Sequence, residues 1–162
     1  MSLDPSSTVT ALHTAGISHV VWIPDSHLGL WEAPLLESGR PYLIRATREG
    51  EVVAIAAGLL IGGARPLAVM QCTGFFEAGD AVRNIVHDLR LPLPMLIGVR
   101  SQRAFLAGET RDNCPSFTEP IVQAWQIPYT WIDPERDSPS DLITAVRSIE
   151  RSHKAGIILW TE

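Results

Sequence analysis

The chain has 162 residues, of which 46% are hydrophobic and 19% are charged, and its formal net charge is -5. This length and composition are typical of one globular domain with a real core and not of a disordered chain. The negative charge and the lack of a basic run argue against nucleic acid as a partner, because phosphate binding depends on Lys and Arg. The longest apolar stretch, residues 52–64, is shorter than the ~20 residues of a membrane-spanning helix, so we expect no membrane association.

The first ten residues, MSLDPSSTVT, are polar and acidic, which is unlike a signal peptide. Cys72 and Cys114 are isolated, with neither CxxC spacing nor a His in metal-ligand register. Reduced thiols are therefore favoured over a disulfide or a metal site. We expect a cytoplasmic protein with no metal ligands of its own. Five Trp residues are many for this length, and some of the rings are candidates for a partner surface.

Helical and strand patterns alternate along the chain. A first helix is expected over residues 6–16, where serines can cap its start and Gly16 can end it. The patterns that follow predict a strand over 18–24, a helix over 28–39, a strand over 41–46, an apolar helix within 46–66, a strand over 65–71, a helix over 80–90 and a strand over 93–100.

The last third of the chain continues the alternation. A loop is expected over 101–117, then a helix over 118–126, a strand over 127–133 and a final strand over 155–162. The helix before that strand has the clearest signals, with Ser138 as its cap and Pro139 in the first helical position. The whole pattern predicts a doubly wound α/β domain over 1–162, with a mostly parallel six-stranded sheet and helices on both faces.

Ligands of such sheets bind at the carboxyl ends of the strands, and three loops at these ends carry unusual residues. These loops are residues 24–29, 46–51 and 71–80, and the loop over 101–114 can cover the same edge. The candidate groups that converge there are Asp25, Ser26, His27, Glu49, Glu51, Gly74, Glu77 and Asp80.

Each candidate also has a purely structural interpretation. The first loop can simply start a turn or cap the next helix, and His27 can be a half-exposed loop residue. Glu49 and Glu51 are favourable in the first turn of any helix because of the helix dipole, and Asp80 can cap the helix after it. The motifs GxxxxGK[ST], GxGxxG and GxSxG are absent. The residues alone therefore predict an α/β domain with a polar edge.

The stretch TREGEVVAIAAGLLIGGARPLAVMQCTG, residues 47–74, resembles the pyrimidine-binding domain of thiamine-diphosphate-dependent enzymes, and within them the sulfopyruvate and phosphonopyruvate decarboxylases. The family pattern is a short strand, a Glu that opens a small-residue helix, and a strand that ends in Gln with a small polar residue and Gly behind it. In this chain the pattern falls on Glu49, Gly58, Gln71, Thr73 and Gly74. Residues 12–26 are also similar to the opening helix and strand of the family.

The resemblance implies a catalytic role for Glu49. In these enzymes the Glu hydrogen-bonds a ring nitrogen of the cofactor's aminopyrimidine and favours the tautomer that deprotonates the thiazolium carbon. The cofactor then acts as an electron sink for decarboxylation of a 2-oxo acid. Such a carboxyl group has to be kept out of water so that it can hold a proton near neutral pH. Glu51 projects differently from the helix and has no matching role, so we expect Glu49 to be the catalytic residue.

The resemblance also implies the contacts of the cofactor and the substrate. Cofactor contacts fall on Glu49, Thr73, Gly74, Phe75 and Phe76, and substrate contacts on Asp25, Ser26 and His27. The decarboxylases usually read something like Gln-Asn-Ser-Gly-Leu-Gly-Asn after the third strand, whereas this chain reads QCTGFFEAGD. An added carboxylate and two rings fit poorly beside a dianionic sulfonate unless Arg83 or a partner compensates. A 2-oxo acid decarboxylase of altered specificity is therefore expected.

A second domain holds the diphosphate and Mg²⁺ in these enzymes, marked by Gly-Asp-Gly followed some way on by Asn, and nothing in this chain fits that mark. The resemblance therefore implies an α subunit with half of an active site, completed by a β subunit that carries the diphosphate-binding domain and the Mg²⁺. We also expect self-association. Two alternatives stay open: a subunit of a thiamine-diphosphate-dependent carbon–carbon lyase or ligase, and a non-catalytic binding or regulatory module with the same fold.

Overall fold

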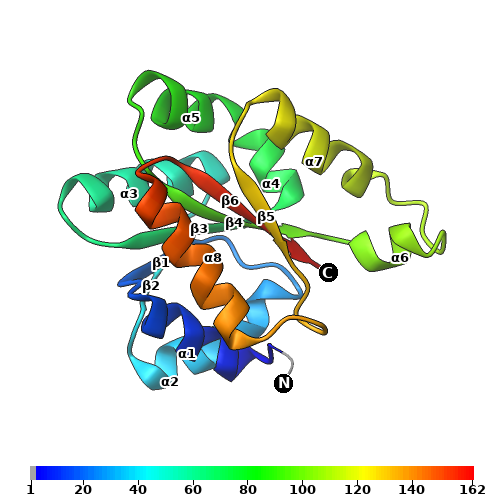
Figure 1. The fold of residues 1–162 in the computed structure, drawn as a ribbon, viewed down its shortest axis with the longest axis horizontal. Coiled ribbons are helices and arrows are strands. Elements are labelled where there is room, and N and C mark those ends of the chain that lie inside the picture. Colours follow the sequence, from blue (N-terminus) through cyan, green and yellow to red (C-terminus); the bar gives the residue numbers. More distant parts are fainter. Residues whose placement is uncertain (1–2) are drawn as a thin grey trace.

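The computed structural model describes residues 3–162, which form a six-stranded sheet with helices on both faces (Figure 1). The strands are β1 (His19–Trp22), β2 (Tyr42–Arg45), β3 (Pro66–Gln71), β4 (Pro94–Val99), β5 (Tyr129–Ile132) and β6 (Gly156–Thr161). They lie in the order β2-β1-β3-β4-β6-β5, and all neighbouring strands are parallel. The predicted doubly wound α/β fold is therefore confirmed.

Two layers of helices cover the sheet. One face carries α1 (Pro5–Ala15), the 3-10 helix η1 (Leu28–Trp31), α2 (Glu32–Ser38) and α8 (Pro139–Ser152). The other face carries α3 (Glu49–Ile61), α4 (Cys72–Glu77), α5 (Gly79–Arg83) and α7 (Cys114–Ala124), with a π-helix, η2 (Asn84–Asp88), directly after α5. Among residues 3–162, no helix is both long and apolar enough to cross a bilayer.

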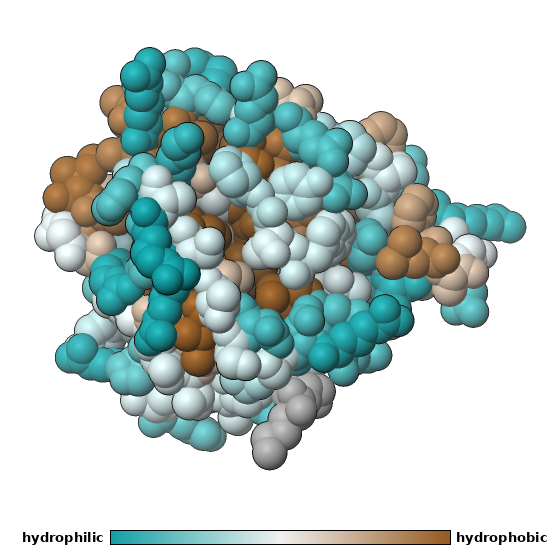
Figure 2. Space-filling model, viewed as in Figure 1, coloured by the Kyte–Doolittle hydropathy of each residue, from teal (hydrophilic) through white to brown (hydrophobic). Residues whose placement is uncertain are grey.

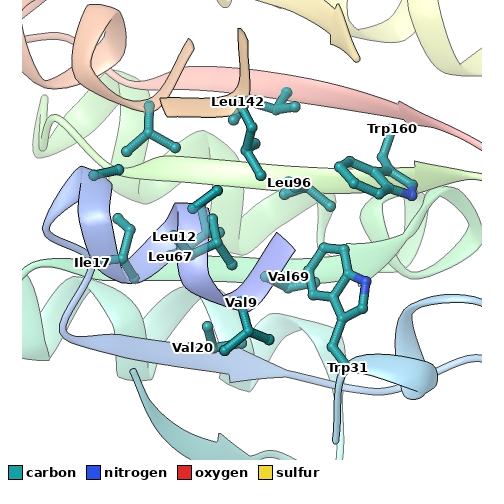
Figure 3. Packing of buried hydrophobic residues seen from close by; sticks show 14 of the residues in the cluster. Val9, Leu12, Ile17, Val20, Trp31, Leu67, Val69, Leu96, Leu142 and Trp160 are labelled. Carbon is teal, nitrogen blue, oxygen red and sulfur yellow. The ribbon is translucent and has the colours of Figure 1, made fainter. Parts of the chain in front are cut away.

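The core beneath α1 and α8 is built from alternate residues of the strands (Figure 3). Val20 and Leu67 lie opposite each other in neighbouring strands, and both side chains point into this core. Residues two further along each strand share the same face of the sheet. The rings of Trp31 and Trp160 meet edge to face, with 5.2 Å between their centroids. Both rings are buried, as is Trp22, so most of the Trp residues belong to the core and not to a partner surface.

Only one side of α3 is buried, although almost the whole helix is apolar. Val52, Val53, Ala56 and Ala57 pack onto the sheet, whereas Ile61 is 70% exposed. The apolar composition of α3 therefore does not mean that the helix is buried on every side. The outward side of α3 leaves an apolar stripe without a covering element in the described part of the chain.

The helix α6 (Gln102–Leu106) projects from the molecule on the same side as the carboxyl terminus (Figure 1). Phe105 is 39% exposed and Leu106 is 74% exposed. Figure 2 shows the apolar patch that they form on this projection. The segment 101–117, which was expected to be a loop, therefore contains α6 and the first turn of α7.

The segment 71–80 is also helical where a loop was predicted. The helix α4 begins at Cys72, directly after β3, and α5 begins at Gly79. Buried residues recur here at helical spacing, at Cys72, Phe75, Ala78 and Val82. This spacing is the signal in the sequence that indicates a helix, but Gly74 and Gly79 suggested a turn instead. The helix predicted over 80–90 consists of α5 as far as Arg83 and of the π-helix η2 from Asn84 to Asp88.

The capping predictions for α1 and α8 were correct at two of three ends. Asp4, and not a serine, caps α1, because its Oδ1 accepts the backbone N–H of Ser7 at 2.9 Å. Gly16 ends α1 with a φ of 98°, as predicted. At the start of α8, Asp141 Oδ2 accepts the backbone N–H of Ser138 at 2.8 Å, as expected of a capped helix.

Candidate functional site

The carboxyl ends of four adjacent strands, β1, β3, β4 and β6, meet at one edge of the sheet. The register pairs Gln71 at the end of β3 with Gly98 in β4, and Gly98 with Trp160 in β6. Residues from these strands and from the loops behind them are therefore brought together, as the doubly wound pattern requires.

Asp25 joins the loop after β1 to the end of β3. Its Oδ1 accepts the backbone N–H groups of His27 and Leu28, both at 2.8 Å, and its Oδ2 accepts Gln71 Nε2 at 3.0 Å. Gln71 Oε1 in turn accepts Thr73 Oγ1 at 2.9 Å. Asp25 thus forms the turn that leads into η1, as its structural interpretation predicted, and it also connects this loop to α4.

The two other predicted substrate-binding residues lie at the tip of the same loop. Ser26 and His27 are exposed, whereas Asp25 is half-buried. Of the three, Asp25 is the residue whose side chain is fixed by hydrogen bonds. The loop therefore presents one immobilised carboxylate and two exposed polar side chains at the edge.

Glu49 is the first residue of α3, and its side chain lies across Gly74 of α4. A Cβ at Gly74 would overlap the Cγ and the carboxylate of Glu49. Only glycine leaves the room for this crossing, so the two residues have to be considered together. Glu49 is half-buried.

Glu51 has a different function in the same helical turn. Its Oε2 accepts Thr47 Oγ1 at 2.7 Å, the Thr47 backbone N–H at 3.1 Å and the Arg48 backbone N–H at 3.2 Å. The hydrogen bonds from Thr47, that of its hydroxyl first, hold the pKa of Glu51 below its usual value. Glu51 is therefore committed to capping its own helix, which Glu49 does not do.

Glu77 lies on the other side of the same helix start. Its Oε1 accepts Arg48 Nη2 at 2.7 Å, and its Oε2 accepts the backbone N–H of Gly50 at 3.3 Å. Arg48 and the backbone N–H of Gly50 therefore compensate the negative charge of Glu77, which is the added carboxylate of segment 71–80. Arg83, which was considered for this purpose, pairs instead with carboxylates near its own helix.

The remaining candidates of segment 71–80 have varied surroundings. Phe75 is fully buried against Trp125, with 5.7 Å between the ring centroids, so contact with a cofactor would require its ring to leave the core. Phe76 is half-buried and Thr73 is exposed. Asp80 does not cap α5 but lies inside it, and its Oδ1 accepts Arg83 Nη2 at 2.9 Å.

One residue that the sequence did not single out lies beside Gly98 at this edge. Glu162 follows β6, is only 8% exposed, and both of its carboxyl oxygens lack a hydrogen-bond partner within residues 3–162. A Cβ at Gly98 would overlap its carboxyl group. Burial, and then the neighbouring Asp25, raise the pKa of Glu162 to about 8, while Arg100 acts in the opposite direction. A glutamate at the carboxyl end of an apolar strand was its only local signal.

Asp112 organises the far side of this edge. Its Oδ2 accepts Arg100 Nε at 2.7 Å, and its Oδ1 accepts the backbone N–H of Cys114 at 3.0 Å. The hydrogen bond from Arg100 holds the pKa of Asp112 well below its usual range. Asp112 is therefore held in place by hydrogen bonds to two parts of the chain.

The two cysteines are unpaired thiols, as predicted. Burial, followed by the hydrogen bond to Asp112, raises the pKa of Cys114 to about 11. Burial likewise raises the pKa of Cys72. In the described range 3–162, no three His, Cys, Asp or Glu side chains are grouped so that they could hold a metal ion.

Comparison with known proteins identifies distant relatives, although no protein-family model matches the chain. Over 90 residues, 56% of the chain, it is 26% identical to phosphonopyruvate decarboxylases of Streptomyces viridochromogenes and Streptomyces hygroscopicus, of which it covers 23% and 22%. It is 33% identical over 67 residues, 41% of the chain, to a sulfopyruvate decarboxylase of Methanosarcina acetivorans, of which it covers 17%. The chain thus spans less than a quarter of the length of these relatives.

Solved structures share the fold along almost the whole chain. A benzoylformate decarboxylase from Polynucleobacter necessarius superposes with a TM-score of 0.73 at 20% identity, over 99% of this chain and 30% of that one. A thiamine diphosphate-dependent 4-hydroxybenzoylformate decarboxylase from Rhodococcus jostii superposes with a TM-score of 0.65 at 17% identity, over 97% of this chain and 29% of that one. The predicted resemblance is confirmed: the chain is similar in sequence to the phosphonopyruvate and sulfopyruvate decarboxylases, and it shares its fold with part of the two solved decarboxylases.

Proposed function

We propose that the chain is the pyrimidine-binding α subunit of a thiamine-diphosphate-dependent 2-oxo acid decarboxylase. A separate β subunit would hold the diphosphate and the Mg²⁺. The observation that carries the proposal is the Glu49 side chain lying across Gly74 at the carboxyl edge of the sheet. The limited share of the related chains that this chain covers, 30% in the first solved structure, supports the need for further domains or subunits.

The residues around Glu49 fit a flat aminopyrimidine ring. Gly74 offers no side chain beside the carboxylate, and the neighbouring Glu51 and Glu77 are held by other donors. Glu49 would bind a ring nitrogen of thiamine diphosphate, and Thr73 and Gly74 would lie along the ring. Thiamine diphosphate, when bound, supplies the electron sink for decarboxylation.

The residues of this chain then have distinct tasks. Glu49 would hold and return a proton at the ring nitrogen, a task that suits its half-buried position. Asp25, joined to Thr73 through Gln71, would orient the substrate from the neighbouring loop. Ser26 and His27, both exposed at its tip, would donate hydrogen bonds to the 2-oxo acid.

The charges at the edge limit the substrate. Asp25 and Glu49 place carboxyl groups there, and Arg48 and Arg100 are both paired with carboxylates. A second strongly anionic group on the substrate would meet few unpaired cations of this chain. We therefore propose a 2-oxo acid with a neutral remainder, which agrees with the altered segment after β3.

Two surfaces suit the assembly. The projecting α6 exposes Phe105 and Leu106 at the edge that the second subunit would have to approach. The exposed side of α3, which includes Ile55 and Ile61, is available for self-association. Apolar patches of this kind are typical of interaction sites.

The test is a Glu49→Gln variant assayed with a partner that contains the Gly-Asp-Gly and Asn motif. A positioned proton-transfer group typically contributes at least ~100-fold, so turnover should fall by that factor. Release of CO₂ from a series of 2-oxo acids is the measurement, and Glu37→Gln on the outer surface of α2 is the control. Normal turnover by the Glu49 variant would exclude its catalytic role.

The same experiment separates the alternatives. A carbon–carbon ligase would also depend on Glu49, but it would join two substrates into a longer product, which mass spectrometry detects. A non-catalytic module would give no turnover with any partner. Calorimetry on the isolated chain should show weak or no binding of thiamine diphosphate, and tight binding without a partner contradicts the division of the site.

A further inference from the structure

Gln71, Gly98 and Glu162 lie on the same side of the sheet at its carboxyl edge. Each is two residues beyond a residue of the core beneath α1 and α8, and side chains two apart in a strand share a face. Leu28 of η1 covers this row, because a Cβ at Gly98 would lie 3.1 Å from Leu28 Cδ1. The Glu162 carboxyl group therefore lies in the space that the missing side chain of Gly98 leaves, beneath η1.

Asp25 is the neighbour of this buried carboxyl group. It already accepts three hydrogen bonds, from His27, Leu28 and Gln71. Both oxygens of Glu162, in contrast, have no donor within residues 3–162. Two ionised carboxylates are acceptors only and cannot bond each other, whereas a protonated carboxyl group is a donor. A proton on Glu162 gives one of its oxygens a partner in Asp25 and removes the repulsion between two carboxylates.

We propose that Glu162 is a positioning residue, which fixes Asp25 and the loop after β1 by donating its carboxyl proton to Asp25. Loss of that proton would release the loop. The inference rests on the proposed function only for the role of Asp25 beside the substrate. The hydrogen bond itself belongs to this chain alone.

The other charged and titratable groups near Glu162 come from several elements. Arg100, after β4, favours the ionised form, and Cys72, at the start of α4, is also close enough to interact with it. Arg103 of α6 donates its backbone N–H to a main-chain oxygen of Glu162 at 3.0 Å, while its guanidinium pairs with Asp133. Burial and Asp25 together affect the pKa of Glu162 more than Arg100 does. Arg100 itself forms an ion pair with Asp112.

The proposal makes the loop sensitive to pH. Below about pH 8 the Glu162 carboxyl group is protonated and donates to Asp25. Above that pH two carboxylates face each other where little water screens them, and their repulsion acts directly on Asp25. The bonds from His27, Leu28 and Gln71 to Asp25 would then loosen together.

Nuclear magnetic resonance on the labelled 162-residue chain tests this directly. The side-chain carboxyl carbon of Glu162 should titrate with a midpoint near pH 8. The backbone N–H signals of His27 and Leu28 and the side-chain amide of Gln71 should shift with the same midpoint. In Glu162→Gln the amide donates to Asp25 at every pH, so these three signals should show no step between about pH 6 and 9.5. Glu37→Gln, on the exposed side of α2, should keep the step.

Two results would overturn the proposal. One is a Glu162 carboxyl group that titrates near 4.5, the ordinary value for glutamate. The other is a step in the three signals that persists in Glu162→Gln. Because the wild-type titration decides the first point, the test does not depend on the folding of any variant. Gly98→Ala, which displaces the Glu162 carboxyl group, should move the midpoint down toward 4.5.

An activity measurement distinguishes this inference from the proposed function. With the partner subunit, kcat/KM of the wild type should fall above about pH 8, whereas that of Glu162→Gln should stay level to about pH 9.5. A resonance step near pH 8 without turnover of any 2-oxo acid refutes the proposed function alone. Turnover without the resonance step refutes the inference alone.

Discussion

Gly74 of α4 has no side chain at the place where the Glu49 side chain of α3 crosses it. The two helices begin at the carboxyl ends of different strands, and they approach each other closely only because this position is glycine. Glu77, one turn further along α4, reinforces the approach by accepting the Gly50 backbone N–H at 3.3 Å. The position of Glu49 is therefore set by α4 as much as by its own helix.

Gly74→Ala should displace Glu49. The added methyl group overlaps the Glu49 side chain, and overpacking of this kind costs about 1–3 kcal/mol. We expect a lower midpoint of urea unfolding and, with the partner present, turnover reduced by at least ~10-fold, since misplacement of a catalytic group is costly. Gly50→Ala is the matched control, because its Cβ would have ordinary contact, 3.9 Å, with Ala81 Cβ. Equal turnover in the two variants would contradict this account of Gly74.

Glu51→Ala should affect stability and not chemistry. The variant removes the acceptor of three hydrogen bonds at the start of α3, so the thermal midpoint should fall by about 3 °C, a typical effect of a lost cap in a chain of this length. Turnover per folded molecule should be unchanged. Calorimetry and the CO₂ assay are the measurements, and a large loss of turnover in the folded variant would mean that Glu51 and not Glu49 acts on the cofactor.

The burial of Glu162 should make stability fall as pH rises. Its pKa in the folded chain, about 8, exceeds the ordinary value of 4.5, so the folded state binds more protons between these two values. The stabilisation is complete below 4.5 and is lost as pH rises through about 8, with a total of up to roughly 5 kcal/mol. Urea unfolding of the wild type and of Glu162→Gln at pH 5, 7 and 9 measures this. A difference between the two proteins that does not change with pH would contradict the prediction.

Cys114 should react slowly with thiol reagents. Its pKa of about 11 leaves so little thiolate at pH 8 that alkylation should be on the order of 100-fold slower than that of an ordinary thiol. Asp112→Asn removes the negative charge that helps to raise this pKa, so it should accelerate the reaction. Mass spectrometry after timed exposure to iodoacetamide, with the urea-unfolded chain as reference, is the measurement. Equal rates in the folded and unfolded chains would argue against it.

The strands and the well-capped helices could be predicted because their signals are local. The β6 segment is continuously apolar, and α8 carries Ser138, Pro139 and Asp141 at its start. The helix α4 was missed for a tertiary reason. Gly74 and Gly79 read as turn residues, whereas Gly74 is there to accommodate Glu49 from another helix.

The candidate site shows the same limit. Glu49 could be selected from the sequence because the pattern around it is contiguous. Glu162 could not, because its burial depends on β6 lying beside β4, an arrangement made by residues far apart in the chain. The contact of Asp25 with Gln71, 46 residues away, is equally invisible in a local pattern.

The hydrogen bonds from Thr73 to Gln71 and from Gln71 to Asp25 tether the first loop to α4. These hydrogen bonds restrict the first loop and α4 together. A ligand that immobilises one of the two segments therefore reduces the conformational entropy that the other still has to lose on binding. A molecule that settles against Thr73 and one that settles against Asp25 would then help each other to bind. Such cooperation needs no movement of the sheet and no change of fold.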